Sequence, residues 1–305
     1  MLAALSAIGA DGATLLDPRT AHIVVDGSRV VSRHAVPGVE LRVAELGERL
    51  TAELVVARGA RIEAPIHTCI GFLGARGTQR IEMRLRLEAG ADAMVLAHCL
   101  FPNAEAGSHA MRAAIELEAG AVLRYREGHY HGAAGGMDVR PRLDVRLGPG
   151  ARYFSDFSLT RGTVGRLRIG QRITAADDTV AEVTARVFGR AADEIHIRDE
   201  LLLAGRASRG LVKTRIALCD DARAVVVGIT HGQGEGARGH MDCLELVRDR
   251  AVARAEPIVD VSHPLAKVTH EAAVGTVDQS QLETLMAHGL APEEAIDLIV
   301  TGILQ

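Results

Sequence analysis

A short motif recurs at a nearly constant interval through the middle of the chain. Leu87-Glu-Ala-Gly-Ala91 returns as Leu117-Glu-Ala-Gly-Ala121 and as Leu147-Gly-Pro-Gly-Ala151, and Arg58-Gly59-Ala60 is an earlier copy. A period of roughly 30 residues is typical of stacked supersecondary units, because one such unit is too small to bury its own apolar face. The repeat therefore predicts a solenoid.

The segments between these motifs have the pattern of strands. Ile81-Glu-Met-Arg-Leu-Arg-Leu87 alternates apolar and charged residues, which indicates a strand with one buried face. Later turns lose the glycine but keep the rhythm: Asp177-Asp178, Ala192-Asp193 and Asp220-Asp221 each precede an apolar run. We expect a mostly β protein built as a β-helix over residues 53–274, with a β-sandwich as the alternative.

The two ends of the chain have a different character. Residues 1–52 predict a mixed region with some helix and a short strand at Ile23-Val-Val25, and residues 275–305 predict two helices. Asp278 is suited to cap the first helix, and Pro292 suits the first turn of the second. Their apolar positions form stripes that need a surface to cover them, either the β core or a partner: Leu282, Leu285, Met286, Ile296, Ile299, Val300 and Ile303.

Composition excludes several classes of function. The 305 residues carry a net charge of −4, with both signs mixed along the chain, and they include no Trp, three Tyr and five Phe. Nucleic acid is therefore not an expected partner, since phosphate binding needs a basic surface and single strands stack on aromatic rings. The four cysteines are far apart and are expected to be reduced thiols. No apolar run is long enough for a membrane span, and no signal peptide is evident, so we expect a soluble, cytoplasmic protein.

Nucleotide-binding motifs are absent or weak. The spacing from Gly205 to Lys213-Thr214 does not fit a P-loop. Gly234-Glu-Gly-Ala-Arg-Gly239 matches the glycine fingerprint of dinucleotide-binding folds, and Asp260 lies about where an acidic partner would be. However, no alternation of strands and helices surrounds it, so a flexible surface loop is the favoured interpretation.

Two further patterns suggest metal sites but have simpler interpretations. Gly128-His-Tyr-His-Gly132 resembles the paired histidines of cupins, yet solvent-facing or turn histidines are favoured because no Glu follows. Cys69 and Cys99, with His67 and His98 nearby, are spaced like equivalent positions on successive repeats. They would form a metal site across coils or, as we favour, pack as small apolar side chains.

A sharper group of candidate ligands lies near the C-terminal end. His240, Asp242 and Cys243 fall within four residues, and His270-Glu271 follows about one coil later. The two segments are therefore expected on neighbouring strands. Mixed sulfur, nitrogen and oxygen ligands suit iron or zinc, or an iron–sulfur cluster that must be released, because fewer thiolates hold it less firmly.

The same region resembles a known family. Val268-Thr-His-Glu-Ala-Ala-Val-Gly275, His288-Gly289-Leu290 and Ile299-Val-Thr-Gly302 are similar to the C-terminal signature of SufB/SufD iron–sulfur cluster assembly proteins. Glu127-Gly-His-Tyr-His-Gly132 and Gly239-His-Met-Asp-Cys243 resemble the compact form found in archaea and some bacteria. The resemblance covers roughly residues 55–305.

This resemblance implies a right-handed parallel β-helix, dimerisation through that β-helix, and C-terminal helices that bind the ABC-type ATPase SufC. It implies a scaffold role, without enzyme activity of its own, in building a transient iron–sulfur cluster. His270 matches the family's C-terminal histidine, Glu271 is SufB-like, and Cys243 lies near the cysteine that SufB uses. The expected second subunit is another copy of the chain or a paralogous SufB/SufD protein.

Two other functions remain open from the sequence. One is a SufD-like structural adaptor that binds the ATPase without a cluster of its own. The other is a β-helix enzyme acting on carbohydrate, which the absence of Trp and of a signal peptide argues against.

Overall fold

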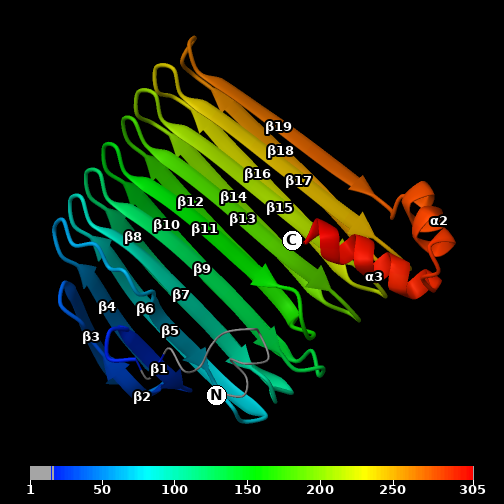
Figure 1. Ribbon diagram of the computed structural model, residues 1–305, viewed down its shortest axis with the longest axis horizontal. Coiled ribbons are helices and arrows are strands. Elements are labelled where there is room, and N and C mark those ends of the chain that lie inside the picture. Colours follow the sequence, from blue (N-terminus) through cyan, green and yellow to red (C-terminus); the bar gives the residue numbers. More distant parts are fainter. Residues whose placement is uncertain (1–14, 16, 305) are drawn as a thin grey trace.

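Two long sheets of mainly parallel strands wind into a β-solenoid of about 8 turns (Figure 1). The computed structural model describes Leu15 and residues 17–304. From residue 49 on, successive strands alternate between the two sheets, so each coil of the solenoid contributes one strand to each. A β-solenoid was predicted from the repeat and is confirmed, whereas the alternative of a sandwich is wrong.

From residue 49 on, the spatial order of the strands follows the chain from one end of the stack to the other. The ten-stranded sheet contains β19 (Lys267–Gly275), β17 (Arg238–Val247), β15 (Arg209–Leu218), β13 (Val180–Gly189), β11 (Arg152–Leu159), β9 (Val122–His131), β7 (Asp92–Phe101), β5 (Ile66–Gly71), β1 (His22–Asp26) and β2 (Arg29–His34). The nine-stranded sheet contains β18 (Val252–Val261), β16 (Arg223–Gly232), β14 (Glu194–Leu203), β12 (Gly165–Ala175), β10 (Met137–Leu147), β8 (Ala106–Leu117), β6 (Arg76–Leu87), β4 (Arg49–Val56) and β3 (Val39–Leu46).

Alternation along each strand builds the core. In β6, Ile81, Met83, Leu85 and Leu87 are buried inside the solenoid, while the residues between them are exposed. Because every coil repeats this pattern in register, the inward side chains form apolar clusters that extend along the interior of the solenoid. Polar residues inside this interior are therefore exceptions that need an explanation.

The repeated glycines occupy one corner of the coils. Gly90, Gly120 and Gly150 have φ angles of +71°, +68° and +69°, the left-handed region that glycine adopts without strain. Where the glycine is lost, Asp178 takes the same corner position between β12 and β13, with φ of +57°, while Asp220 has φ of +59° at the opposite corner, between β15 and β16. Both aspartates are therefore turn residues, because short polar side chains tolerate this region best after glycine.

The N-terminal strands join the same two sheets. Ile23 lies in β1, as predicted, and β1 pairs in parallel with β5. The predicted domain boundary near residue 52 falls inside β4, which pairs in parallel with β6. Residues 17–52 form strands and turns, and residues 1–14 and 16, where helix was also expected, lie outside the described residues.

Two short helices follow the last coil. In α2 (Gln279–Ala287), the Asp278 carboxylate caps the first turn by accepting a hydrogen bond from the Gln281 amide at 2.9 Å. In α3 (Pro292–Ile303), the Glu294 carboxylate accepts one from the Ala291 amide at 3.0 Å. Both predicted helix starts are confirmed, and Figure 1 shows the pair at the C-terminal end of the stack.

Candidate functional site

The candidate ligands near the C-terminal end lie on two adjacent strands. β17 pairs in parallel with β19, and the register places Asp242 beside Glu271 and Met241 beside His270. The two segments are neighbours because they occupy the same position in successive coils. Their side chains, however, alternate between the two faces of the sheet.

Cys243 and His270 meet on the inner face. The Cys243 thiol is buried, and its Sγ lies 3.8 Å from Nε2 of His270. Burial, followed by the nearby Glu245 carboxyl, raises the pKa of Cys243 to about 12. Burial also lowers the pKa of His270 below its usual range. In the absence of a ligand the pair is therefore a neutral thiol and a neutral imidazole at physiological pH.

Two buried carboxyl groups lie in the same interior and were missed in the sequence. Glu245 follows Cys243 by two residues and faces the same way, and neither of its carboxyl oxygens has a hydrogen-bond partner among the described residues. Burial raises the pKa of Glu245 to about 7 and that of Asp199, on β14, to about 7. The alternation of Met241, Cys243 and Glu245 was a signal that would have identified the first of these.

The remaining candidates lie on the outer face. Nδ1 of His240 is 2.7 Å from the Thr269 hydroxyl. The Asp242 carboxylate pairs with the Arg215 guanidinium, whose hydrogen bond holds the pKa of Asp242 below its usual range. Glu271 is exposed on the same outer face. The structure thus divides the five predicted ligands into an inner pair and an outer group.

The inner pair lies at an open end of the solenoid, with His270 on the terminal strand and Cys243 on the strand beside it. β18 and β19 are the terminal strands of their sheets, so each has an edge with no neighbouring strand among the described residues. Large apolar side chains are exposed on these strands and the turn between them: Val252, Ile258, Val259, Val261, Leu265 and Val274. An open edge with apolar side chains is a surface suited to pairing with another chain.

The predicted docking residues of the C-terminal helices divide between the core and solvent. Ile296 and Val300 pack against Phe188 of β13 and Ala217 of β15. Met286 is 41% exposed, and Leu298, which was not in the predicted set, is 52% exposed. Leu282, Leu285, Ile299 and Ile303 are half-buried. The stripe is therefore only partly covered by this chain.

Two interpretations drawn from the sequence require correction. The histidines of Gly128-His-Tyr-His-Gly132 do not face solvent, because His129 and His131 are buried inside the solenoid. Cys69 and Cys99 are not equivalent, since Cys99 pairs with Ile70. That coil is one residue shorter than the repeat between them, which sends the two thiols to opposite faces of the sheet.

The glycine fingerprint lies in a turn between strands, as the favoured interpretation of a loop predicted. Gly234 and Gly236 form a tight corner between β16 and β17, and Gly236 has a φ angle of +67°. A strand follows this corner where a dinucleotide-binding fold would have a helix.

Within the described part of the chain, no helix has the length and apolar character needed to cross a membrane.

Comparisons with known proteins agree with this architecture. Residues 74–303 match the family described as SUF system FeS cluster assembly, SufBD core domain. An iron–sulfur cluster assembly SufBD family protein of Methanocaldococcus jannaschii is 34% identical over 92% of this chain and 89% of its own length. One of Pyrococcus horikoshii is 31% identical over 95% of this chain and 89% of its own. The Bacillus subtilis iron–sulfur cluster assembly protein SufD is 28% identical over 42% of this chain and 30% of its own.

The family match covers most of the solenoid and both helices, and the two archaeal relatives extend over nearly the whole chain. The chain belongs to the SufBD family of SUF-system iron–sulfur cluster assembly proteins, in its compact archaeal-type form.

Proposed function

We propose that this protein is the scaffold subunit of a SUF-type complex and that it builds or holds a labile iron–sulfur cluster at Cys243 and His270. The observation that carries the proposal is the 3.8 Å approach of the thiol to the imidazole beneath the last coil. The cluster is cargo for transfer rather than a resident cofactor. A single thiol per chain suits that task, because a site with fewer thiolates than the usual four holds a cluster less firmly.

The chemistry of the inner pair makes cluster binding conditional. Burial keeps the Cys243 thiol protonated, with its pKa raised to about 12, so an arriving metal must displace that proton. His270 offers a neutral ring nitrogen. Burial raises the pKa of Glu245 and of Asp199 to about 7, so above that pH these carboxylates are ionised and would take up the released proton.

A second subunit would complete the site. The unpaired edges of β18 and β19 and their exposed apolar residues lie beside the inner pair. We propose that another copy of this chain, or a paralogous SufB/SufD subunit, covers this end. One chain supplies one thiol and one imidazole, and a dimer would bring two such sets to the same interface.

A separate ATPase would supply the energy for assembly, since the sequence contains no P-loop. We propose that a SufC-like ABC-type ATPase docks on α2 and α3 and that the complex works in the cytoplasm. Exposed Met286 and Leu298 support this placement, because apolar side chains left uncovered at the end of a small helical appendage suit a partner surface.

Anaerobic reconstitution with iron and sulfide tests the scaffold function. The wild-type chain should acquire a visible charge-transfer spectrum and matching iron and sulfide contents. Cys243→Ala and His270→Ala should each weaken cluster retention by roughly tenfold or more. Cys219→Ala is the matched control, because Cys219 is also a buried free cysteine but lies outside the inner pair. Wild-type cluster contents in both test variants would contradict the proposal.

A SufD-like adaptor is the second candidate. The SufD relative of Bacillus subtilis supports it, as does the presence of only one thiol in the inner pair. In that case the wild-type protein would bind the ATPase but acquire no cluster in the same reconstitution.

A further inference from the structure

A second group of polar side chains lies inside the solenoid, near its N-terminal end. Cys99 on β7, His109 on β8, and Glu127 and His129 on β9 are all buried. Three strands from both sheets therefore direct chemically active groups into an otherwise apolar interior. Such groups are kept inside a protein when they bind one another or a ligand.

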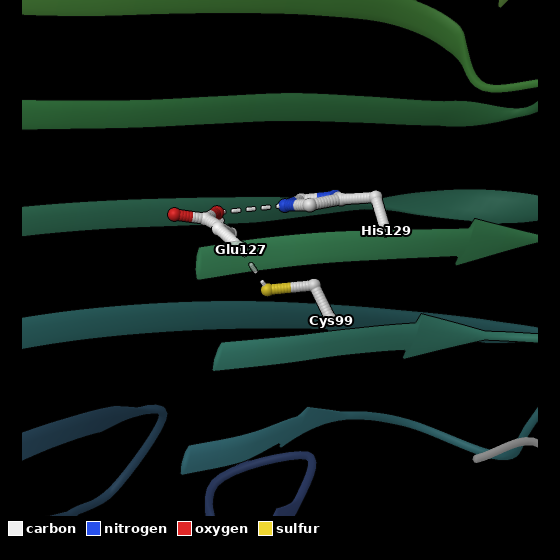
Figure 2. Close-up of side chains that lie close together, drawn as sticks. All are labelled: Cys99, Glu127 and His129. Carbon is white, nitrogen blue, oxygen red and sulfur yellow. Dashed lines mark hydrogen bonds and ion pairs between the residues drawn. The ribbon is translucent and has the colours of Figure 1, made fainter. Parts of the chain in front are cut away.

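The donor atoms of three of these residues lie close together. Figure 2 shows Cys99, Glu127 and His129 pointing toward one another, and their ligand atoms all lie within 4.8 Å of one another. Sγ of Cys99 is 3.9 Å from Oε1 of Glu127, which is 2.8 Å from Nε2 of His129. Ligands around a tetrahedral metal are roughly 3.3–3.8 Å apart, so small side-chain shifts would create that geometry.

His109 is oriented as a fourth ligand. The amide nitrogen of Gln79 donates to the Gly71 carbonyl at 3.1 Å, so its Oε1 faces Nδ1 of His109, 2.7 Å away. Because an amide oxygen only accepts, Nδ1 of His109 carries the proton and Nε2 has a free lone pair. That Nε2 lies 3.9 Å from Sγ of Cys99. Metal-binding histidines are commonly fixed in this way by a second hydrogen bond.

The surrounding residues support the same interpretation. The Tyr125 hydroxyl donates to Oε2 of Glu127 at 3.1 Å and orients the carboxylate. His131 stacks on His129 with ring centroids 5.8 Å apart. Among the described residues, three buried ring nitrogens have no hydrogen-bond partner: Nδ1 and Nε2 of His131 and Nδ1 of His129. The protein by itself therefore leaves some polar atoms of this network without partners.

Charge balance also favours a bound cation. A divalent ion with one thiolate, one carboxylate and two neutral imidazoles forms a set with no net charge. A buried apolar interior accepts such a set far more readily than a separate charge. The donor types select zinc or iron(II), because calcium and magnesium prefer oxygen ligands alone.

We propose that Cys99, His109, Glu127 and His129 bind one zinc or iron(II) ion that joins β7, β8 and β9 inside the solenoid. Four protein ligands leave no open position, which is the arrangement of a structural rather than a catalytic metal. The site is separate from Cys243 and His270, so it does not depend on the proposed cluster site.

Cobalt(II) serves as the probe, in a full-length Cys243→Ala/His270→Ala background that removes the other site. This protein is unfolded and refolded anaerobically with Co²⁺, and then titrated with Zn²⁺ and with Fe²⁺. We expect one Co²⁺ per chain, a thiolate-to-cobalt band, tetrahedral d–d bands and a higher melting temperature. Displacement by Zn²⁺ but not Fe²⁺ would identify zinc as the preferred ion, and the converse would identify iron; either supports the site.

Cys99→Ser and Glu127→Gln should each weaken Co²⁺ binding by roughly tenfold or more. Cys69→Ser is the matched control, because Cys69 is equally buried on the neighbouring strand but faces an apolar cluster outside the interior. If the Cys99→Ser protein fails to fold, the Co²⁺ affinity of the Glu127→Gln protein and the Co²⁺ spectrum of the Cys243→Ala/His270→Ala protein test the proposal instead. Absence of stoichiometric Co²⁺, or a spectrum without the thiolate band, would overturn the proposal.

Discussion

Sγ of Cys243 lies 3.8 Å from Nε2 of His270, across two successive coils of the same sheet. The neighbouring pair on these strands, Asp242 and Glu271, faces the opposite side. Candidate ligands that form one group in the sequence therefore lie on two opposite faces of the sheet. The inner surface has a thiol and an imidazole, and the outer one has carboxylates beside a guanidinium.

This division predicts different effects for inner and outer substitutions. Glu271→Gln and His240→Ala should leave reconstituted cluster content at the wild-type level, because their side chains lie outside the solenoid wall. Iron and sulfide analysis, run beside Cys243→Ala, measures the effect. A loss in Glu271→Gln as large as that in Cys243→Ala would place the cluster on the outer face instead.

The open end predicts how the subunits associate. Ile258→Asp with Val259→Asp should convert the proposed dimer to a monomer in light scattering, because charges would replace two apolar side chains, each 46% exposed, at the edge of the sheet. Leu46→Asp is the control, since Leu46 is 52% exposed on β3, the opposite edge strand of the same sheet. A monomeric control variant, or a double variant that remains dimeric, would contradict this interface.

The helical appendage predicts a docking surface. Met286→Asp with Leu298→Asp should weaken binding of the ABC-type ATPase by at least about tenfold, because burying each side chain contributes ~1.5–3 kcal/mol before association costs. The melting temperature should not change, since both side chains are already exposed. Val31→Asp, a change at a 61% exposed position on β2, is the control in the same calorimetric titration.

The Ile296→Asp and Ile299→Asp changes suggested by the sequence pattern would be a less direct test. Ile296 packs against the solenoid, so its replacement would undock α3 as well as alter the surface. If the Met286→Asp/Leu298→Asp protein bound the ATPase with wild-type affinity, the docking site would lie elsewhere.

Asp199 predicts a loss of stability as the pH rises. Burial raises its pKa to about 7, whereas an unfolded chain has a value near 3.9. Between about pH 4 and pH 7 the folded state binds the proton and the unfolded state does not, so the free energy of unfolding falls over this range. Above pH 7 the buried carboxylate is charged in the folded state, and the free energy of unfolding stays lowered by the full cost of burying that charge.

Asp199→Asn should therefore raise the melting temperature at pH 8 and have little effect at pH 4. The gain has an upper limit of about 4 kcal/mol, since each unit of pKa shift corresponds to 1.36 kcal/mol. Asp144→Asn makes the same change on a side chain that is 57% exposed and serves as the control. Equal melting temperatures for wild type and Asp199→Asn at both pH values would show that the carboxyl is not held neutral.

The corner glycines predict a backbone effect. Gly120→Ala should lower the free energy of unfolding by roughly 1–2 kcal/mol, because φ is +68° there although no atom lies within 4 Å of an added Cβ. Gly275→Ala has the same open surroundings without a positive φ and should be nearly neutral. Denaturant unfolding of the two variants separates backbone strain from side-chain crowding, and equal stabilities would contradict the explanation.

The sequence alone determined the architecture. The motif ending in Gly90, Gly120 and Gly150 predicted coils of roughly 30 residues, because a left-handed corner must recur wherever the chain turns into the next strand. Asp278 and Pro292 predicted the two helices for local reasons of the same kind. The nearness of Cys243 and His270 followed from the coil length as well.

Tertiary structure decided which side of the sheet each residue faces. A strand has a side-chain period of two, so a coil that is one residue shorter sends a side chain to the opposite face. That is why Cys69 lies outside the interior and Cys99 inside it, although the sequence spaced them like equivalents. His109 reaches Cys99 from the other sheet, and no spacing along the chain records such a contact, because the distance between facing sheets depends on how the whole interior packs.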